Sequence, residues 1–221
     1  LKAKDNRWKI ALGAISLMFM FLVIQTATRG TIVGLAGGLF VGSAYIALFS
    51  NTYPAVRKWS LGILTAITVA VAGLFVLKDT NFVQDHLILS RAASIGLSEL
   101  ELRIQIWDMA IEGVKERPIL GWGQDNFNYI FNREYNPEIY YAELWYDRAH
   151  NVFMDWLVAG GVLGLLTYLS IFFASVYYIL FRPLLKRGEK EEQFSVMERG
   201  LLLGILAGYF THNLVVFDNI V

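Results

Sequence analysis

The longest apolar run of the chain is Val152–Phe181, which reads VFMDWLVAGGVLGLLTYLSIFFASVYYILF. It contains 30 residues, and its only charged side chain is Asp155. Because about 20 apolar residues in a helix cross the hydrocarbon core of a bilayer, this stretch predicts a membrane-spanning helix. The helix is long enough to tilt in the membrane or to project beyond it. We therefore expect an integral membrane protein.

Four further apolar runs lie on either side of this stretch, and each is about long enough to span a bilayer. They cover residues 10–27, 31–49, 61–77 and 201–217. The composition agrees, because 56% of the residues are hydrophobic, which is more than an ordinary soluble domain contains. The sequence predicts an all-α, polytopic bundle of about five spans. A cleaved signal peptide over residues 2–28 is the less favoured reading, because its apolar run is long and four more spans follow.

The basic residues between the runs predict the orientation of the bundle. Those on one side lie in three short segments and are Lys2, Lys4, Arg7, Lys9, Arg57, Lys58, Arg182, Lys186, Arg187, Lys190 and Arg199. The opposite side carries residues 78–148, in which acidic residues outnumber basic ones. Because short loops rich in lysine and arginine stay in the cytoplasm, we expect the long segment to lie outside.

This topology divides the chain into three parts. Residues 1–77 form three spans, residues 78–149 form an external loop, and residues 150–221 form two spans joined by a basic cytoplasmic loop, 182–199. The formal net charge is zero, which gives no reason to expect nucleic-acid binding, and the absence of cysteine excludes disulfides and thiolate chemistry. Since the chain starts at Leu1 and stops just after an apolar run, we expect it to be a piece of a larger protein.

The external loop is predicted to contain an amphipathic helix over residues 98–116. Its apolar stripe consists of Leu100, Ile104, Trp107, Ile111 and Val114. Ser98 with Glu101 predicts a capped start, and Pro118 ends the pattern. We expect this helix to lie across the outer mouth of the bundle with the stripe facing it. The aromatic-rich residues 121–146 that follow suit a membrane-interface belt and a sugar-binding surface equally well.

Glycines at steps of four mark the second and fifth spans. They are Gly30, Gly34, Gly38 and Gly42, and then Gly200, Gly204 and Gly208. Small residues at this spacing let neighbouring membrane helices approach closely. One more step along the second row reaches His212, which should therefore face protein rather than lipid.

Arg29 opens the second span at the predicted outer rim. An arginine at that depth is costly unless it snorkels to the surface or meets an anion. Its small neighbours Thr28 and Gly30 leave space for a ligand, and a guanidinium binds a phosphate through two hydrogen bonds. Arg103 lies at the edge of the amphipathic stripe, where pairing with Glu99 one turn earlier is the simpler explanation.

His150 stands at the outer start of the fourth span, between Arg148 and Asn151. The positive end of a helix dipole disfavours imidazolium, so the neutral ring is able to accept a proton. Asp147 is a candidate cap for this helix and a candidate partner of Arg148, and Asp155 lies one turn inside the helix, in reach of the ring. An ordinary interfacial histidine is the alternative, and no role is assigned to His86.

Three ordered blocks of this sequence resemble the O-antigen ligase and polymerase superfamily of bacterial envelope glycan enzymes. The first is TRG (28–30), and the second is RIQIWDMA (103–110) running into RPILGWGQDNF (117–127). The third is HNVFMD (150–155), followed by GGVLG (160–164). The resemblance covers roughly residues 28–181 and more weakly the pair His212–Asn213. It departs from the family at Ala159, where an acid often precedes the glycine pair, and in having fewer spans.

The resemblance implies a membrane glycosyltransferase that needs no metal and no cofactor. Its donor would be a glycan on undecaprenyl diphosphate, and its acceptor a hydroxyl on lipid A-core or on another glycan, at the outer face of the inner membrane. His150 would match the family's general base, and Arg29 and Arg103 the arginines that bind the diphosphate. We add Arg148 and Asn151 as candidate substrate-binding residues beside His150.

Two other classes of function compete with this one. A transporter or flippase subunit for an anionic or lipid-linked envelope substrate would place charged residues or broken helices near mid-membrane. In this sequence the span interiors are nearly uncharged and the candidate residues gather at one rim, which favours the enzyme. A purely structural envelope protein leaves Arg29 and the ordered blocks unexplained.

Overall fold

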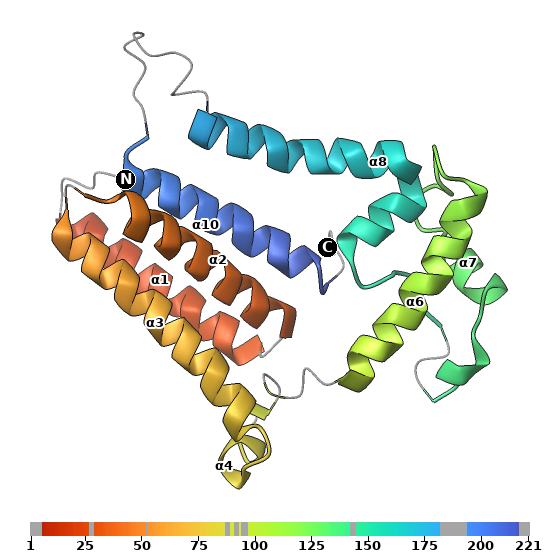
Figure 1. The fold of residues 1–221 in the computed structure, drawn as a ribbon, viewed down its shortest axis with the longest axis horizontal. Coiled ribbons are helices and arrows are strands. Elements are labelled where there is room, and N and C mark those ends of the chain that lie inside the picture. Colours follow the sequence, from red (N-terminus) through yellow and green to blue (C-terminus); the bar gives the residue numbers. More distant parts are fainter. Residues whose placement is uncertain are drawn as a thin grey trace.

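The computed structural model describes residues 6–26, 29–51, 53–86, 89–90, 93, 97–141, 145–181 and 194–216. Every regular element within these ranges is helical. The first helices are α1 (Asn6–Thr26), α2 (Arg29–Phe49) and α3 (Pro54–Leu77), and the short α4 (Asn81–Gln84) follows. The predicted all-α fold is confirmed (Figure 1).

The second half of the chain contains two groups of helices. The loop group consists of α6 (Leu97–Glu116), α7 (Phe127–Arg133) and the 3₁₀ turn η1 (Pro137–Ile139). The other group consists of α8 (Val152–Val176), which continues into the π-helical turn η2 (Tyr177–Phe181), and α10 (Val196–Asn213). In Figure 1, α10 lies between α2 and α8, and α6 and α7 lie beyond the broken end of α8.

Three helical stretches are long and apolar enough to cross a membrane. They are Gly30–Phe49, Pro54–Leu77 and Val152–Phe181, and α1 contains a shorter apolar part, Ile10–Val23. α3 starts seven residues before the predicted run because Pro54, whose fixed φ suits the first turn, begins it. α10 starts at Val196, five residues before the predicted run, because Ser195 and Glu198 form a capping box at that point. The predicted end of that span at 217, and most of the basic loop 182–199, lie outside the described residues.

The glycine rows of α2 and α10 face each other. The spacing predicts a close approach of neighbouring helices, and the structure identifies the two helices that meet. A β-carbon built on Gly38 would lie 2.6 Å from the carbonyl oxygen of Gly204, and one on Gly42 would lie 2.8 Å from that of Gly200. These distances leave no room for a side chain, so the two backbones touch directly. His212 lies against Gly34 and is half-buried, which confirms that it faces protein.

α8 is broken at Gly161, whose φ of 62° and ψ of −161° are not helical. The break divides the stretch into a short arm, residues 152–160, and a long arm, residues 162–181. The rings of Phe153 and Phe172 lie only 6.3 Å apart, although a continuous helix would separate these residues by about 28 Å. The short arm therefore folds back along the long arm, as Figure 1 shows. The predicted span has the right bounds, but its excess length forms this short arm.

Aromatic side chains fill the angle between the two arms and α10. The ring of Phe153 lies 4.8 Å from that of Phe210, and Trp156 stacks on Tyr168 at 5.2 Å. Asn213, with a side chain that is 0% exposed, donates from Nδ2 to the Tyr168 hydroxyl at 2.7 Å. These contacts hold the short arm, and the chain segment just before it, at the end of α10.

The loop helices form a small core of their own against α8. Its fully buried members include Ile106 and Ala110 of α6, Ile130 and Phe131 of α7, and Ile139. α6 ends at the predicted residue and begins one residue early, at Leu97, so Ser98 lies inside the helix. Of the predicted stripe, Leu100, Ile104 and Ile111 are exposed, whereas Trp107 and Val114 pack against this core. Gly113 lies against Ile130, and its lack of a side chain brings a different face of α6 onto α7.

Candidate active site

The backbone around His150 is held by side chains from two helices. The backbone N–H of Ala149 donates to Oδ1 of Asp155 at 2.8 Å, and Nε1 of Trp107 donates to the Ala149 carbonyl at 2.9 Å. Ala149 is completely buried. His150 itself has a φ of 54°, a left-handed conformation that is uncommon for a residue with a side chain. The half-buried imidazole packs edge-on against Tyr146, with ring centroids 5.6 Å apart.

Asn151 starts the short arm of α8 as its N-cap. Its Oδ1 accepts hydrogen bonds from the backbone N–H groups of Phe153 at 3.0 Å and Met154 at 3.3 Å. The hypothesis that Asp147 caps this helix is therefore wrong, because a residue at the N-cap itself satisfies these N–H groups. The same cap places His150 immediately before the N-terminus of the short arm.

Arg103 of α6 joins three segments that are far apart in the sequence. Its Nη1 donates to the carbonyl of His150 at 3.3 Å and to that of Val215 at 2.6 Å. Val215 and Val216 in turn pack against Gly30, the residue after Arg29. Arg103, His150 and the start of α2 therefore meet at one end of the bundle, which we call the Arg29 end.

The side chains of Arg29 and Glu99 lie outside the described residues, and so does the whole of Thr28. The structure consequently gives the position of Arg29 in the chain, at the first residue of α2, and not the direction of its guanidinium. The simpler explanation for Arg103, an ion pair with Glu99, stays untested for the same reason.

Arg148 forms an ion pair with Asp125, with Nη2 2.8 Å from Oδ1. The partner that the sequence suggested, Asp147, is its chain neighbour, whereas Asp125 lies 23 residues away in the loop after α6. Asp125 has a φ of 60° and ends the turn that follows Trp122. The pair therefore ties the segment before His150 to the RPILGWGQDNF block.

That block and the glycine pair of α8 bind each other through backbone hydrogen bonds. The N–H of Trp122 donates to the Val158 carbonyl at 2.8 Å, and that of Gly123 to the Ala159 carbonyl at 2.9 Å. On the other side of the break, the N–H of Val162 donates to the Pro118 carbonyl at 2.8 Å. The loop therefore supplies the partners that α8 loses where it breaks.

Gly121 and Gly161 are the two residues that allow this close contact. Both have a positive φ, 66° and 62°, which favours glycine. A β-carbon on Gly121 would lie 2.6 Å from the carbonyl carbon of Ala159, and one on Gly161 would lie 2.7 Å from the backbone nitrogen of Leu120. Two of the blocks that carry the family resemblance are therefore in direct backbone contact. We call this contact, between residues 118–123 and residues 158–163, the joint.

The side chain of Trp122 connects this backbone contact to α6 and α7. Its Nε1 donates to the carbonyl of Gly113 at 2.7 Å, and the guanidinium of Arg117 lies 4.1 Å from the centre of its ring. Arg133 lies over the same ring at 5.1 Å. Hydrogen bonds to Glu134 and Glu116 raise the pKa of Arg133 above its ordinary value, against a smaller lowering by desolvation.

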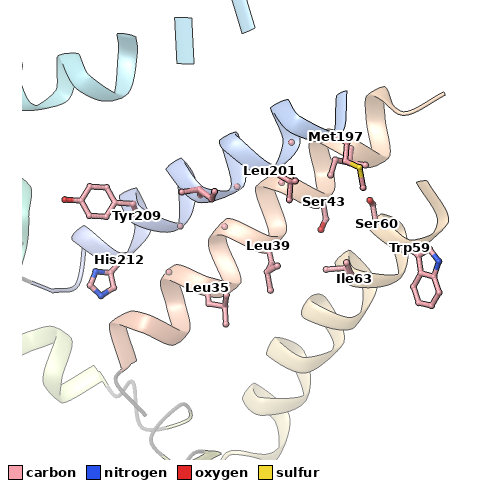
Figure 2. A pocket seen from close by; sticks show the side chains of 18 of the residues that line it. Leu35, Leu39, Ser43, Trp59, Ser60, Ile63, Met197, Leu201, Tyr209 and His212 are labelled. Carbon is pink, nitrogen blue, oxygen red and sulfur yellow. The ribbon is translucent and has the colours of Figure 1, made fainter. Parts of the chain in front are cut away.

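A groove of about 790 Å³ runs along α2, α3 and α10. Trp59 and Met197 line one end of it and His212 lines the other (Figure 2). Thr31, in the first turn of α2, also lines it, so the His212 end is the Arg29 end. Its remaining lining is almost entirely apolar, apart from the buried serines Ser43 and Ser60 near Trp59. Such a groove accommodates a hydrocarbon chain better than a polar ligand.

Sequence reasoning missed several residues that organise the site. The sequence pattern places Trp107 in an apolar stripe, whereas in the structure its indole N–H donates to the Ala149 carbonyl. The sequence pattern marks Asn213 only as the neighbour of His212, whereas in the structure it donates to Tyr168 and leaves its own Oδ1 without a partner among the described residues. A tryptophan inside a loop helix and an asparagine inside an apolar run were the available signals, because both carry polar groups that need partners.

The three long apolar helices, together with α6 and α7 joined to the break in α8, define a helical membrane protein. The family model of the O-antigen ligases matches residues 13–169, which is more than half of the chain and includes Arg29, Arg103, His150 and the joint. The chain belongs to the O-antigen ligase family, whose members are membrane glycosyltransferases of the ligase and polymerase type. Comparisons with curated proteins and with solved structures returned no match.

Proposed function

We propose that this protein transfers a glycan from undecaprenyl diphosphate to an acceptor hydroxyl, on lipid A-core or on another glycan, at the outer face of the bacterial inner membrane. One observation supports the proposal most directly: His150, Arg103 and the residue next to Arg29 meet at one end of the bundle. A base and cationic groups are the parts that such a transfer needs. Membership of the O-antigen ligase family supports the lipid-linked donor.

In the proposed mechanism His150 is the general base. Its neutral imidazole takes the proton of the acceptor hydroxyl while the acceptor oxygen forms a bond to the anomeric carbon of the donor sugar. The bond from that carbon to the diphosphate oxygen breaks in the same step, and the leaving undecaprenyl diphosphate takes the electron pair. The cap by Asn151 and the bonds at Ala149 hold the backbone of the base in one position.

Arg29 and Arg103 bind the diphosphate. The leaving group gains negative charge in the transition state, so a nearby guanidinium lowers the barrier more than it stabilises the bound donor. Arg103 is held half-buried beside the His150 carbonyl, where this charge develops. We assign Arg148 and Asn151 to substrate binding from their places on either side of His150.

The groove along α2, α3 and α10 accommodates the polyprenyl chain of the donor. It extends from Thr31 and His212 at the Arg29 end towards Trp59, and its lining is almost wholly apolar (Figure 2). A donor placed in this way has its diphosphate among the arginines and its hydrocarbon in the membrane. This arrangement needs no soluble activated sugar.

The deciding experiment measures glycan transfer from a lipid-linked donor by His150→Ala in the full-length protein. We expect a fall of at least about 100-fold in kcat, the usual contribution of a general base, with normal membrane insertion. His86→Ala is the matched control, because His86 is exposed and remote in sequence from the site, and it should transfer normally. Transfer at the wild-type rate by His150→Ala would refute the assignment.

Arg29→Lys separates bidentate phosphate binding from simple positive charge. Lysine keeps the charge but loses the planar pair of donors, so we expect weaker donor binding and slower transfer. A titration of donor concentration against initial rate measures both. Unchanged kinetics would mean that Arg29 only snorkels to the membrane surface.

One observation favours the runner-up, a transporter or flippase subunit. α8 is broken, and broken helices line substrate paths in transporters. Here the break is filled by the backbone of residues 118–123, and no charged residue lies between 156 and 181. Reconstituted vesicles distinguish the two: an enzyme consumes donor and forms product, whereas a flippase moves intact donor across the bilayer.

A further inference from the structure

Two of the most exposed aliphatic side chains of the loop domain lie in the joint with α8. Ile119 is 63% exposed and Leu120 is 74% exposed. Both follow Pro118 and precede Gly121, whose backbone is pressed against α8. The backbone of this turn is therefore rigidly held, while its two large side chains point away from the protein.

The joint places these side chains beside the start of the long arm of α8. The N–H of Val162 donates to the Pro118 carbonyl at 2.8 Å, and that of Leu163 to the Ile119 carbonyl at 3.4 Å. Val162 and Leu163 are themselves exposed. We call Ile119, Leu120, Val162 and Leu163 the apex patch.

The apex patch continues the exposed face of the membrane-spanning long arm. Exposed side chains follow Leu163 at helical spacing, at Leu166, Ser170, Phe173 and Tyr177. The long arm contains 20 residues and is about 30 Å long, which matches the hydrocarbon core of a bilayer. The patch therefore lies at the level where this helix leaves the hydrocarbon.

The residues on either side of Ile119 and Leu120 are typical of a membrane interface. Arg117 and Trp122 flank the turn, and their side chains stack on each other at 4.1 Å. Tryptophan and snorkelling arginine concentrate at the level of lipid headgroups. No charged residue occurs between 118 and 124 or between 156 and 181, so the patch itself has no charge to keep it in water.

We propose that the apex patch is inserted into the bilayer, with Ile119 and Leu120 among lipid chains of the leaflet at the Arg29 end. The partner is lipid hydrocarbon, because the patch is continuous with the lipid-facing side of α8 and bordered by interfacial side chains. The turn of residues 118–121 is thus a membrane anchor for a loop domain that does not span the membrane.

This anchor is mechanically connected to the candidate base. The two residues that follow the turn, Trp122 and Gly123, donate from their backbone N–H groups to the carbonyls of Val158 and Ala159, near the end of the short arm. His150 immediately precedes the other end of that arm. The lipid contact therefore sets the height of His150 relative to the membrane surface. This consequence rests on the proposed function, whereas the lipid contact itself does not.

The absence of cysteine from the chain makes a direct test simple. Leu120→Cys carries an environment-sensitive fluorophore, and the protein is reconstituted in vesicles of phosphatidylethanolamine and phosphatidylglycerol. Leu166→Cys is the lipid-facing reference, and Gln124→Cys, an exposed polar position four residues after Leu120, is the aqueous reference. Quenching is measured with nitroxide-labelled lipid and with iodide in the buffer.

We expect the label at 120 to be quenched by nitroxide lipid at least half as strongly as the label at 166, and several-fold less by iodide than the label at 124. Iodide quenching equal to that at 124 would overturn the proposal. Protection from both quenchers would also overturn it, because a protein segment or a second copy would then cover the patch.

A second measurement does not depend on the labelled variant. Ile119→Ser with Leu120→Ser removes the anchor while retaining the backbone joint, and the amides of Trp122 and Gly123 report on that joint by hydrogen exchange in the same vesicles. We expect faster exchange in vesicles and a smaller rise, or none, in detergent. Equal exchange of wild type and variant in vesicles would show that lipid does not support the joint. Neither measurement requires transfer activity, so loss of the proposed function would leave both results interpretable.

Discussion

Among single residues, Ala149 is important to the candidate site through its backbone rather than through its methyl side chain. It is completely buried, its N–H is bound by Asp155, and its carbonyl is bound by Trp107. A buried peptide group without partners is costly, so both bonds stabilise one position of the chain just before His150. The left-handed φ of His150 is maintained by these neighbours.

Trp107→Phe should weaken this corner without removing its packing. The variant keeps an aromatic ring but leaves the Ala149 carbonyl without its donor, which we expect to cost about 1–3 kcal/mol of unfolding free energy. If His150 is the base, kcat should fall more than the KM for donor rises. Thermal unfolding in detergent and transfer kinetics measure the two effects. Trp145→Phe, at an exposed position, is the control; equal effects of both changes would contradict the role of the Ala149 bond.

At the scale of elements, the break in α8 turns one predicted span into a spanning arm and a folded-back arm. Proline is not its cause, because the helix contains none. The break occurs where Gly161 adopts a backbone conformation open almost only to glycine and where another segment supplies the missing hydrogen bonds. α8 therefore breaks at Gly161 and not elsewhere along its length.

The two adjacent glycines allow a matched test of the break. Gly161→Ala requires a β-carbon at a positive φ and against the backbone of Ile119 and Leu120, so we expect a loss of about 2–4 kcal/mol in stability, or failure to fold. Gly160→Ala has open space around it and should cost about 1 kcal/mol at most. Comparing their yields and melting temperatures in detergent checks the prediction. Similar losses in both variants would contradict the joint.

At the scale of the whole molecule, the glycine contact between α2 and α10 and the joint at α8 produce one end that carries His150 and Arg103 and one apolar groove that leads to it. α3 forms the other wall of the groove and does not approach His212 (Figure 2). In the proposed function, these two features separate the charged and the hydrocarbon parts of one lipid-linked donor.

Leu39→Trp tests this use of the groove. Leu39 points into it from α2, so a larger side chain should fill part of the volume and raise the KM for the lipid-linked donor several-fold, with kcat at saturating donor nearly unchanged (Figure 2). Leu61→Trp is the control, because Leu61 is exposed on α3 but does not line the groove. An unchanged KM in Leu39→Trp would mean that the donor chain lies elsewhere.

Sequence patterns alone predict the membrane class, the bounds of α6 to within one residue, the bounds of the stretch Val152–Phe181, and a glycine-lined face on α2 and on α10. These features follow from local patterns, because apolar length and small-residue spacing act within single helices or between parallel faces. The blocks around Arg29, Arg103 and His150 also predicted the family from local sequence.

How these pieces meet depends on contacts between residues that are distant in the sequence. The pairing of Gly121 with Gly161, the bond from Trp107 to Ala149 and the ion pair of Arg148 with Asp125 join residues 23–42 positions apart. Hydrogen-bond partners at that separation depend on how the backbone turns, and the turn at Gly161 has no periodic signal in an apolar run. The packed face of α6 differs from the predicted stripe at Leu100, Ile104 and Ile111 for the same reason, because Gly113 admits Ile130 at a place where hydrophobicity alone favours another side.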